Sequence, residues 1–204
     1  MTAHLAARPR TMTPRHGILV IAALGLLAGC ASTGTIHGRV QLPNAVTSRT
    51  VVTAWPEAEA APPHVHGRAR VVLDGGQFVP SVLVVRPGTE VEFRNRDGVY
   101  HAPFSITPAA TFDLGQCAPG KRQRFAFERV GVVEVYCALH PKEVLHVVVA
   151  TYRWHTQPAA DGSFSFEHVP DGTYFVRAWD PTAGDVTKRV RVSGHEPALV
   201  SFNR

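Results

Sequence analysis

Several features that mark common protein classes are scarce or missing in this sequence. Its 204 residues include three cysteines, too few for the disulfide framework of small secreted domains. The longest apolar run, residues 17–28, is too short to span a bilayer as a mature helix. Lysine and arginine form no block interleaved with aromatic residues, so no nucleic-acid partner is expected.

Catalytic motifs are missing as well. No Ser/His/Asp arrangement and no glycine-rich phosphate loop stands out. The acidic residues Asp97, Asp113 and Glu134 form no pair with the spacing of a general acid and base. The sequence therefore predicts a protein that is not an enzyme.

Short apolar segments with the character of strands fill the chain after residue 30. They are rich in valine and aromatic residues and are bounded by glycine or proline. No segment there keeps apolar residues at helical spacing for three turns. The pattern predicts an all-β protein, with strands at 51–55, 82–85, 90–93, 124–127, 132–136, 145–152, 186–192 and 198–202.

The N-terminal apolar run has the length of a signal-peptide core and follows Arg15. It ends in Leu-Ala-Gly-Cys at 27–30, which resembles a bacterial lipobox. Residues 1–29 are therefore predicted to be a lipoprotein signal peptide, and Cys30 to carry the lipid. Because Ala31 follows rather than aspartate, analogy with Gram-negative lipoproteins favours a lipid anchor on the periplasmic side of the outer membrane. A plain secretory signal with an incidental cysteine is the alternative.

Removal of the signal peptide changes the charge balance. The whole chain has 21 basic and 16 acidic residues. Arg8, Arg10 and Arg15 lie in the signal peptide and no acidic residue does, which leaves 18 basic against 16 acidic residues. The high isoelectric point of the whole chain therefore does not indicate nucleic-acid binding.

Cys137 and His140 stand together at the end of an apolar strand, and His101 lies 36 residues upstream. A cysteine that follows segment 132–136 places its sulfur at a strand terminus. A histidine three residues later folds back across a short turn to the same ion. One thiolate and two imidazoles are the in-plane ligands of a blue-copper centre. The sequence predicts one mononuclear copper ion bound by these three residues.

The remaining cysteine leaves an alternative open. With Cys30 lipidated, an oxidising compartment permits a Cys117–Cys137 disulfide. The placement of His101 and His140 favours a metal thiolate at Cys137 instead, because a disulfide would not involve the two histidines. Cys117 is then a small residue beside a turn.

Residues 77–101 and 131–140 resemble cupredoxins. The resemblance rests on Gln-Phe-Val-Pro at 77–80, on Pro-Gly-Thr-Glu at 87–90 with the strand that leads to Asn95, and on the Cys-x-x-His-Pro turn. Phe-Asp-Leu-Gly at 112–115 is similar to plastocyanin-like proteins labelled methylamine-utilisation proteins. The resemblance implies a Greek-key β-sandwich over 68–152, one copper ion, and one-electron transfer with an unknown redox or copper-donor partner.

A second unit resembles the carboxypeptidase regulatory-like β-sandwich. Asp161-Gly162 and Asp171-Gly172 are turn pairs between alternating strands. The resemblance assigns this sandwich to residues 31–58 and 156–204, with a linker at 59–67. The copper-type domain is then inserted in, or packed beside, this second sandwich, which in such proteins usually has a packing or docking role.

Glu143 occupies the position at which the family normally has methionine, the weak axial ligand. A carboxylate there is a hard, anionic donor that favours Cu(II) and a lower potential. The alternatives are a solvent-facing Glu143 with a three-coordinate ion, or a water or His146 as fourth ligand. Zinc also tolerates a His-His-Cys-Glu set.

Three functions fit these residues. The first is a lipid-anchored electron carrier that uses the copper couple. The second is a copper-binding or copper-delivery protein without a redox role, which a carboxylate ligand suits. The third is a structural envelope lipoprotein whose metal site has degenerated and whose second sandwich docks to another protein.

Overall fold

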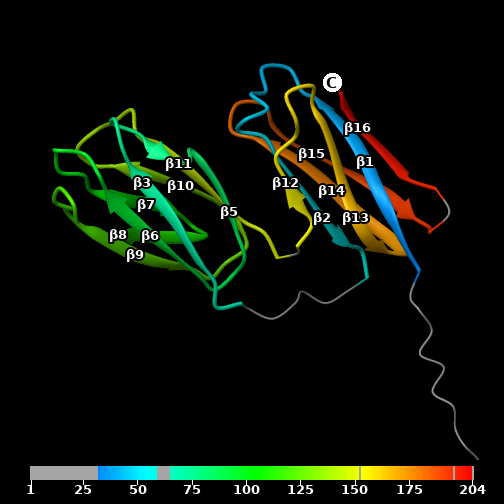
Figure 1. The fold of residues 1–204 in the computed structure, drawn as a ribbon, viewed down its shortest axis with the longest axis horizontal. Coiled ribbons are helices and arrows are strands. Elements are labelled where there is room, and N and C mark those ends of the chain that lie inside the picture. Colours follow the sequence, from blue (N-terminus) through cyan, green and yellow to red (C-terminus); the bar gives the residue numbers. More distant parts are fainter. Residues whose placement is uncertain (1–31, 59–64, 152, 195, 204) are drawn as a thin grey trace, which may run out of the picture. The chain divides into compact units, whose positions relative to one another are not determined.

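The computed structural model describes residues 32–58, 65–151, 153–194 and 196–203 (Figure 1). In these ranges the secondary structure consists of strands, turns and bends without a helix, which confirms the all-β prediction. Accordingly, no helix in the described ranges is long and apolar enough to cross a membrane. The predicted signal peptide, Cys30 and residues 59–64 of the predicted linker lie outside the described residues.

One pair of sheets is built from the two ends of the described chain, and we call it the terminal sandwich. Its sheets have the strand orders β13-β1-β16 and β12-β2-β14-β15. Their side chains meet in one core, which includes Ile36, Val52, Phe166, Val176 and Phe202. The strands are β1 (Thr33–Gln41), β2 (Val51–Pro56), β12 (His155–Thr156), β13 (Ser163–Pro170), β14 (Gly172–Asp180), β15 (Gly184–Val192) and β16 (Ala198–Asn203).

The nine strands between β2 and β12 form a second pair of sheets, the inserted sandwich. The sheet orders are β5-β11-β10-β7-β8 and β4-β3-β6-β9, with parallel pairing of β5 with β11 and of β3 with β6. The chain therefore leaves the terminal sandwich after β2 and re-enters it at β12. The strands are β3 (Arg68–Leu73), β4 (Phe78–Val79), β5 (Val82–Val85), β6 (Thr89–Asn95), β7 (Pro103–Thr107), β8 (Ala110–Asp113), β9 (Arg122–Phe127), β10 (Gly131–Cys137) and β11 (Val144–Val149).

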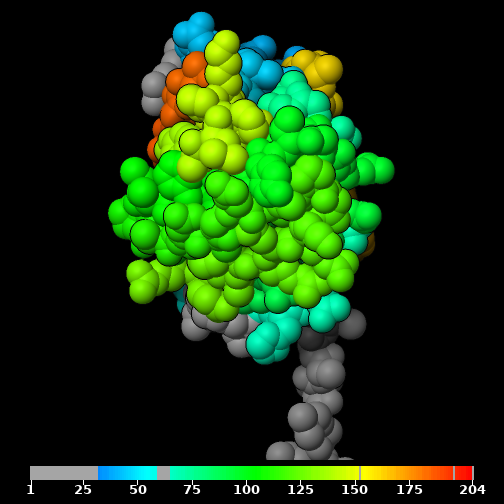
Figure 2. Space-filling model, turned by 90° about the vertical axis from the view of Figure 1, so that its left-hand side faces the viewer, coloured from blue at the N-terminus to red at the C-terminus, as the bar shows by residue number. Residues whose placement is uncertain are grey.

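The core of the inserted sandwich joins both of its sheets and includes Cys137. In β10 the alternation of a strand turns Val133, Val135 and Cys137 inward, where all three are buried. In β6 the same alternation ends with the buried Asn95. Figure 2 shows, mainly in green, the surface that residues of the inserted sandwich form on the face drawn. Cys137 therefore stands at the end of a packed apolar row.

Most of the predicted strands are present, but some boundaries and short strands differ. The strand predicted at 145–152 runs over Val144–Val149 and ends before the chain returns to the terminal sandwich. The strands β3, β4, β7, β8 and β12 were not predicted. β7 and β8 form a hairpin with each other, whereas β12 pairs with β2, which lies far earlier in the chain.

Candidate metal centre

Two consecutive turns after β10 bring Cys137, His140 and Glu143 together. The backbone N–H of His140 donates to the carbonyl of Cys137 at 3.3 Å, and that of Glu143 donates to the carbonyl of His140 at 3.0 Å. The N–H of Ala138 donates to the carbonyl of Ala102 at 2.9 Å, which ties the turn to the segment that carries His101. Cys137, His140 and Glu143 therefore form one cluster. Their turns are held in place at the start by the hydrogen bond between Ala138 and Ala102.

His101 is held by the loop that follows β6. The side-chain amide of Asn95 donates to the carbonyls of Val99 at 2.7 Å and of Cys117 at 2.9 Å. The backbones of His101 and Cys117 exchange two hydrogen bonds, with N···O distances of 3.2 and 2.6 Å. Because both neighbouring segments fix its backbone, the His101 imidazole enters the interior and is fully buried.

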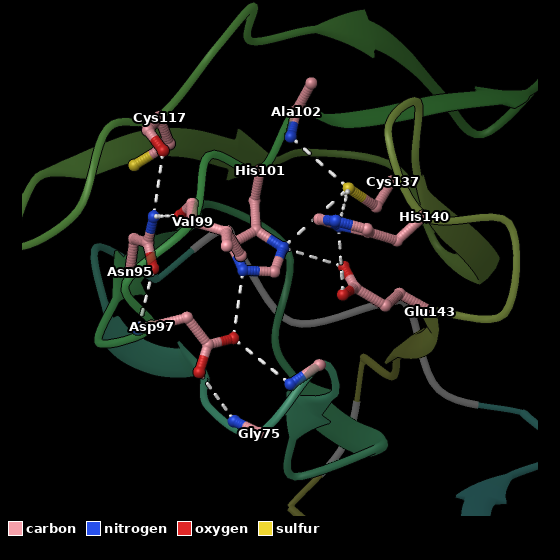
Figure 3. Close-up of polar contacts among 11 residues, drawn as sticks. Gly75, Asn95, Asp97, Val99, His101, Ala102, Cys117, Cys137, His140 and Glu143 are labelled. Atoms are coloured by element: carbon pink, nitrogen blue, oxygen red, sulfur yellow. Dashed lines mark hydrogen bonds and ion pairs between the residues drawn. The ribbon is translucent and has the colours of Figure 1, made fainter.

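The four predicted ligand residues present their donor atoms to one another (Figure 3). The Sγ atom of Cys137 lies 3.9 Å from Nδ1 of His101 and 3.5 Å from Nδ1 of His140. The Glu143 carboxylate lies 2.9 Å from Nδ1 of His101 and 3.2 Å from Nδ1 of His140. All four donor atoms lie within 4.8 Å of one another. Donors at about 2.0–2.3 Å from one tetrahedral ion are spaced roughly 3.3–3.8 Å apart, so this cluster needs little movement to bind a metal.

Glu143 belongs to the interior of this cluster. Its side chain is 2% exposed, although glutamate is among the residues most often found in solvent. The structure therefore does not support the alternative in which Glu143 faces solvent. His146 stays outside the four-residue cluster and lies in β11, 3.8 Å from Glu134. His140 is the exposed member, with 37% of its side chain accessible.

Burial and hydrogen bonds act in opposite directions on the thiol of Cys137. Burial raises its pKa, whereas N–H groups of Ala102 and Leu139 stabilise the thiolate and lower it. The Ala102 N–H lies 3.4 Å from the sulfur. The net pKa is raised, so a thiolate at this position would need a nearby cation, and a metal ion held by Cys137 would supply one.

The two described cysteines are free and buried, so the alternative of a Cys117–Cys137 disulfide is not realised in this structure. Cys117 contributes through its backbone, which pairs with His101 and accepts the hydrogen bond from Asn95. Its sulfur is not a member of the donor cluster.

Sequence reasoning missed three residues around His101: Asp97, which contacts its imidazole, and Gly75 and Gly76, which contact Asp97. Asp97 lies 3.0 Å from the outer nitrogen of His101 and accepts hydrogen bonds from the backbone of Gly75 and Gly76. Asp97 had been considered only as a partner in acid/base catalysis. The spacing of four residues between Asp97 and His101, both in one loop, was the available signal.

Among the known proteins compared, this chain is similar to solved structures and to no family model or curated protein. No protein-family model matches this chain, and no curated protein matches it. A purple cupredoxin from Nitrosopumilus maritimus is 29% identical, with 40% of this chain and 99% of that protein covered and a TM-score of 0.37. The Cu(I) form of an amicyanin mutant is 21% identical over 48% of this chain and 99% of amicyanin, with a TM-score of 0.39.

A copper-containing nitrite reductase from Thermus scotoductus SA-01 is also similar in part. It is 23% identical, and the match covers 55% of this chain but only 28% of the reductase, with a TM-score of 0.39. With TM-scores below 0.5, these three structures do not assign the chain to a family.

Proposed function

We propose that this protein binds one copper ion through His101, Cys137 and His140, with Glu143 as a fourth ligand, and that it carries single electrons. The observation that supports this best is the group of four donor atoms within 4.8 Å of one another, three of them on buried residues. A thiolate with two imidazoles is a donor set typical of copper, although zinc also tolerates it. Copper bound there supplies a one-electron couple.

In this proposal the polypeptide keeps the four metal-donor atoms in fixed positions. Asn95 and the backbone of Cys117 fix His101, and the two turns after β10 fix Cys137, His140 and Glu143. Donors that keep their places in both oxidation states need little reorganisation when an electron moves. His140 is the member of the four that reaches the surface, and in this proposal it faces the partner.

A second candidate function is copper storage or delivery without electron transfer. The buried carboxylate of Glu143 favours it, because a hard anionic donor stabilises Cu(II) against reduction. A degenerate site, as in a purely structural lipoprotein, accords less well with four donors that converge. In all of these proposals the terminal sandwich packs or docks and has no catalytic role.

A copper titration tests the proposed function. Metal-free protein should take up one equivalent of Cu(II), develop an intense sulfur-to-copper absorption band and give a mononuclear EPR spectrum. Ascorbate should bleach the band and air should restore it over repeated cycles if the protein carries electrons. Binding that cannot be cycled favours storage or delivery. Absence of saturable binding, or binding without the sulfur band, would contradict a copper–thiolate centre.

We further propose that Cys30 carries the lipid that anchors the protein to the periplasmic side of the outer membrane. The protein should then sediment with outer membranes and resist a salt wash, because acyl insertion is apolar rather than electrostatic. Cys30→Ala should release the protein or leave it unprocessed. An intact mass without an acyl group, or a mature N-terminus elsewhere, would disprove lipidation.

A further inference from the structure

The two ring nitrogens of His101 meet different surroundings. Nδ1 faces the donor cluster, 2.9 Å from the Glu143 carboxylate and 3.9 Å from the sulfur of Cys137. Nε2 points the other way and lies 3.0 Å from Oδ2 of Asp97. The imidazole is fully buried, so protein groups replace water around it. Each ring nitrogen therefore has a carboxylate as its hydrogen-bond partner.

Asp97 is anchored on its far side by a turn of two glycines. Gly75 and Gly76 both have positive φ values, 63° and 69°, in the loop between β3 and β4. Their N–H groups donate to the two carboxylate oxygens of Asp97 at 2.7 and 3.1 Å. Successive N–H groups that point the same way form an anion-binding concavity. Side chains other than glycine are disfavoured at both positions, so this arrangement depends on the Gly-Gly pair.

Both carboxylate oxygens of Asp97 accept a hydrogen bond from this loop, from the N–H groups of Gly75 and Gly76. A carboxylate has acceptor sites and no proton to donate. In the contact between Asp97 and His101, Nε2 of the imidazole is therefore the donor.

We propose that Asp97, anchored by Gly75 and Gly76, is a positioning residue that holds the Nε2 proton of His101 and aims Nδ1 at the metal. This inference rests on the proposed function and assigns a role to residues outside the ligand set. Outer carboxylates of this kind fix the tautomer and ring orientation of a metal-bound histidine and make it a stronger donor. Three hydrogen bonds thus link the β3–β4 loop to the metal centre.

NMR of the metal-free full chain with 15N-labelled histidine tests this role without any metal. The Nε2 proton of His101, assigned by its loss in a His101→Gln variant, should give a slowly exchanging signal. Asp97→Ala should shift that signal and expose it to exchange. Asp97→Asn, which keeps the shape but not the charge, should have a smaller effect in the same direction. Asp161→Asn is the matched control, because Asp161 also accepts a backbone N–H, from Ser163, in the terminal sandwich.

Copper affinity is the second measurement. Asp97→Ala should weaken Cu(II) binding by about 10–100-fold, whereas Asp161→Asn should leave it unchanged. A protected Nε2 proton in Asp97→Ala, with affinity within about two-fold of wild type, would overturn the proposal. A wild-type protein that binds no copper but loses the protected proton in Asp97→Ala would refute the copper function and confirm that Asp97 sets the protonated nitrogen.

Discussion

Replacing Cys137 by serine is expected to abolish the sulfur-to-copper absorption band of the copper-loaded protein. Serine lacks the soft thiolate that defines this donor set, and its hydroxyl stays protonated near neutral pH. Binding should weaken by more than about 100-fold, beyond the roughly 10–100-fold cost of losing an outer-shell partner. Absorption, EPR and competition with a copper chelator measure both effects.

Cys117→Ser is the matched control, because Cys117 is also a free and buried cysteine. Its backbone rather than its sulfur contacts His101, and serine preserves that backbone. The absorption band should therefore remain in this variant. Loss of the band in Cys117→Ser together with its retention in Cys137→Ser would show that the ligand assignment is wrong.

Replacing Glu143 should change the colour and potential of the copper centre more than any other single substitution that retains copper. A carboxylate ligand strengthens the fourth bond and weakens the copper–thiolate bond. Wild type should therefore absorb at higher energy than the ~600 nm band of a blue site, and appear green or yellow with a lowered potential. Glu143→Met supplies a weak, neutral donor and should give a blue spectrum with a higher potential.

Glu143→Ala separates ligation from a merely electrostatic effect. It removes both the donor atom and the charge, whereas Glu143→Gln removes the charge and retains an oxygen donor. If Glu143 ligates, the alanine variant should approach a three-ligand blue spectrum and the glutamine variant should lie between it and wild type. A wild type that is already blue, with spectrum and potential unchanged in Glu143→Met and Glu143→Ala, would place Glu143 outside the ligand set.

The sequence alone did not determine whether the Glu143 side chain faces solvent or the metal site. Its position three residues after His140 suggested an axial ligand, but the general preference of glutamate for solvent argued the other way. The structure buries the carboxylate between the two imidazoles, where it contacts both Nδ1 atoms. One of these partners, His101, lies 42 residues away along the chain, so the general preference of glutamate for solvent did not describe this site.

The strand pattern by itself determined much of the architecture. The apolar segment 132–136 predicted a strand with Cys137 at its end, and the structure places Cys137 in register with the buried Val133 and Val135. The spacing from Cys137 to His140 is local and needed only a short turn. Side chains two residues apart share one face of any strand, so these features follow from the nearby sequence alone.

Only the tertiary structure decided which distant groups meet. It pairs the His101 backbone with Cys117, turns Asp97 toward Nε2, and brings Gly75 and Gly76 against the Asp97 carboxylate. It also pairs β1 with β13 and β16, strands more than a hundred residues away along the chain. The sequence by itself determined the all-β class, the position of Cys137 at a strand end and the candidate donors. The packing of both sheets decided how the donors are aimed, because the direction of a buried side chain depends on neighbours that the local sequence does not contain.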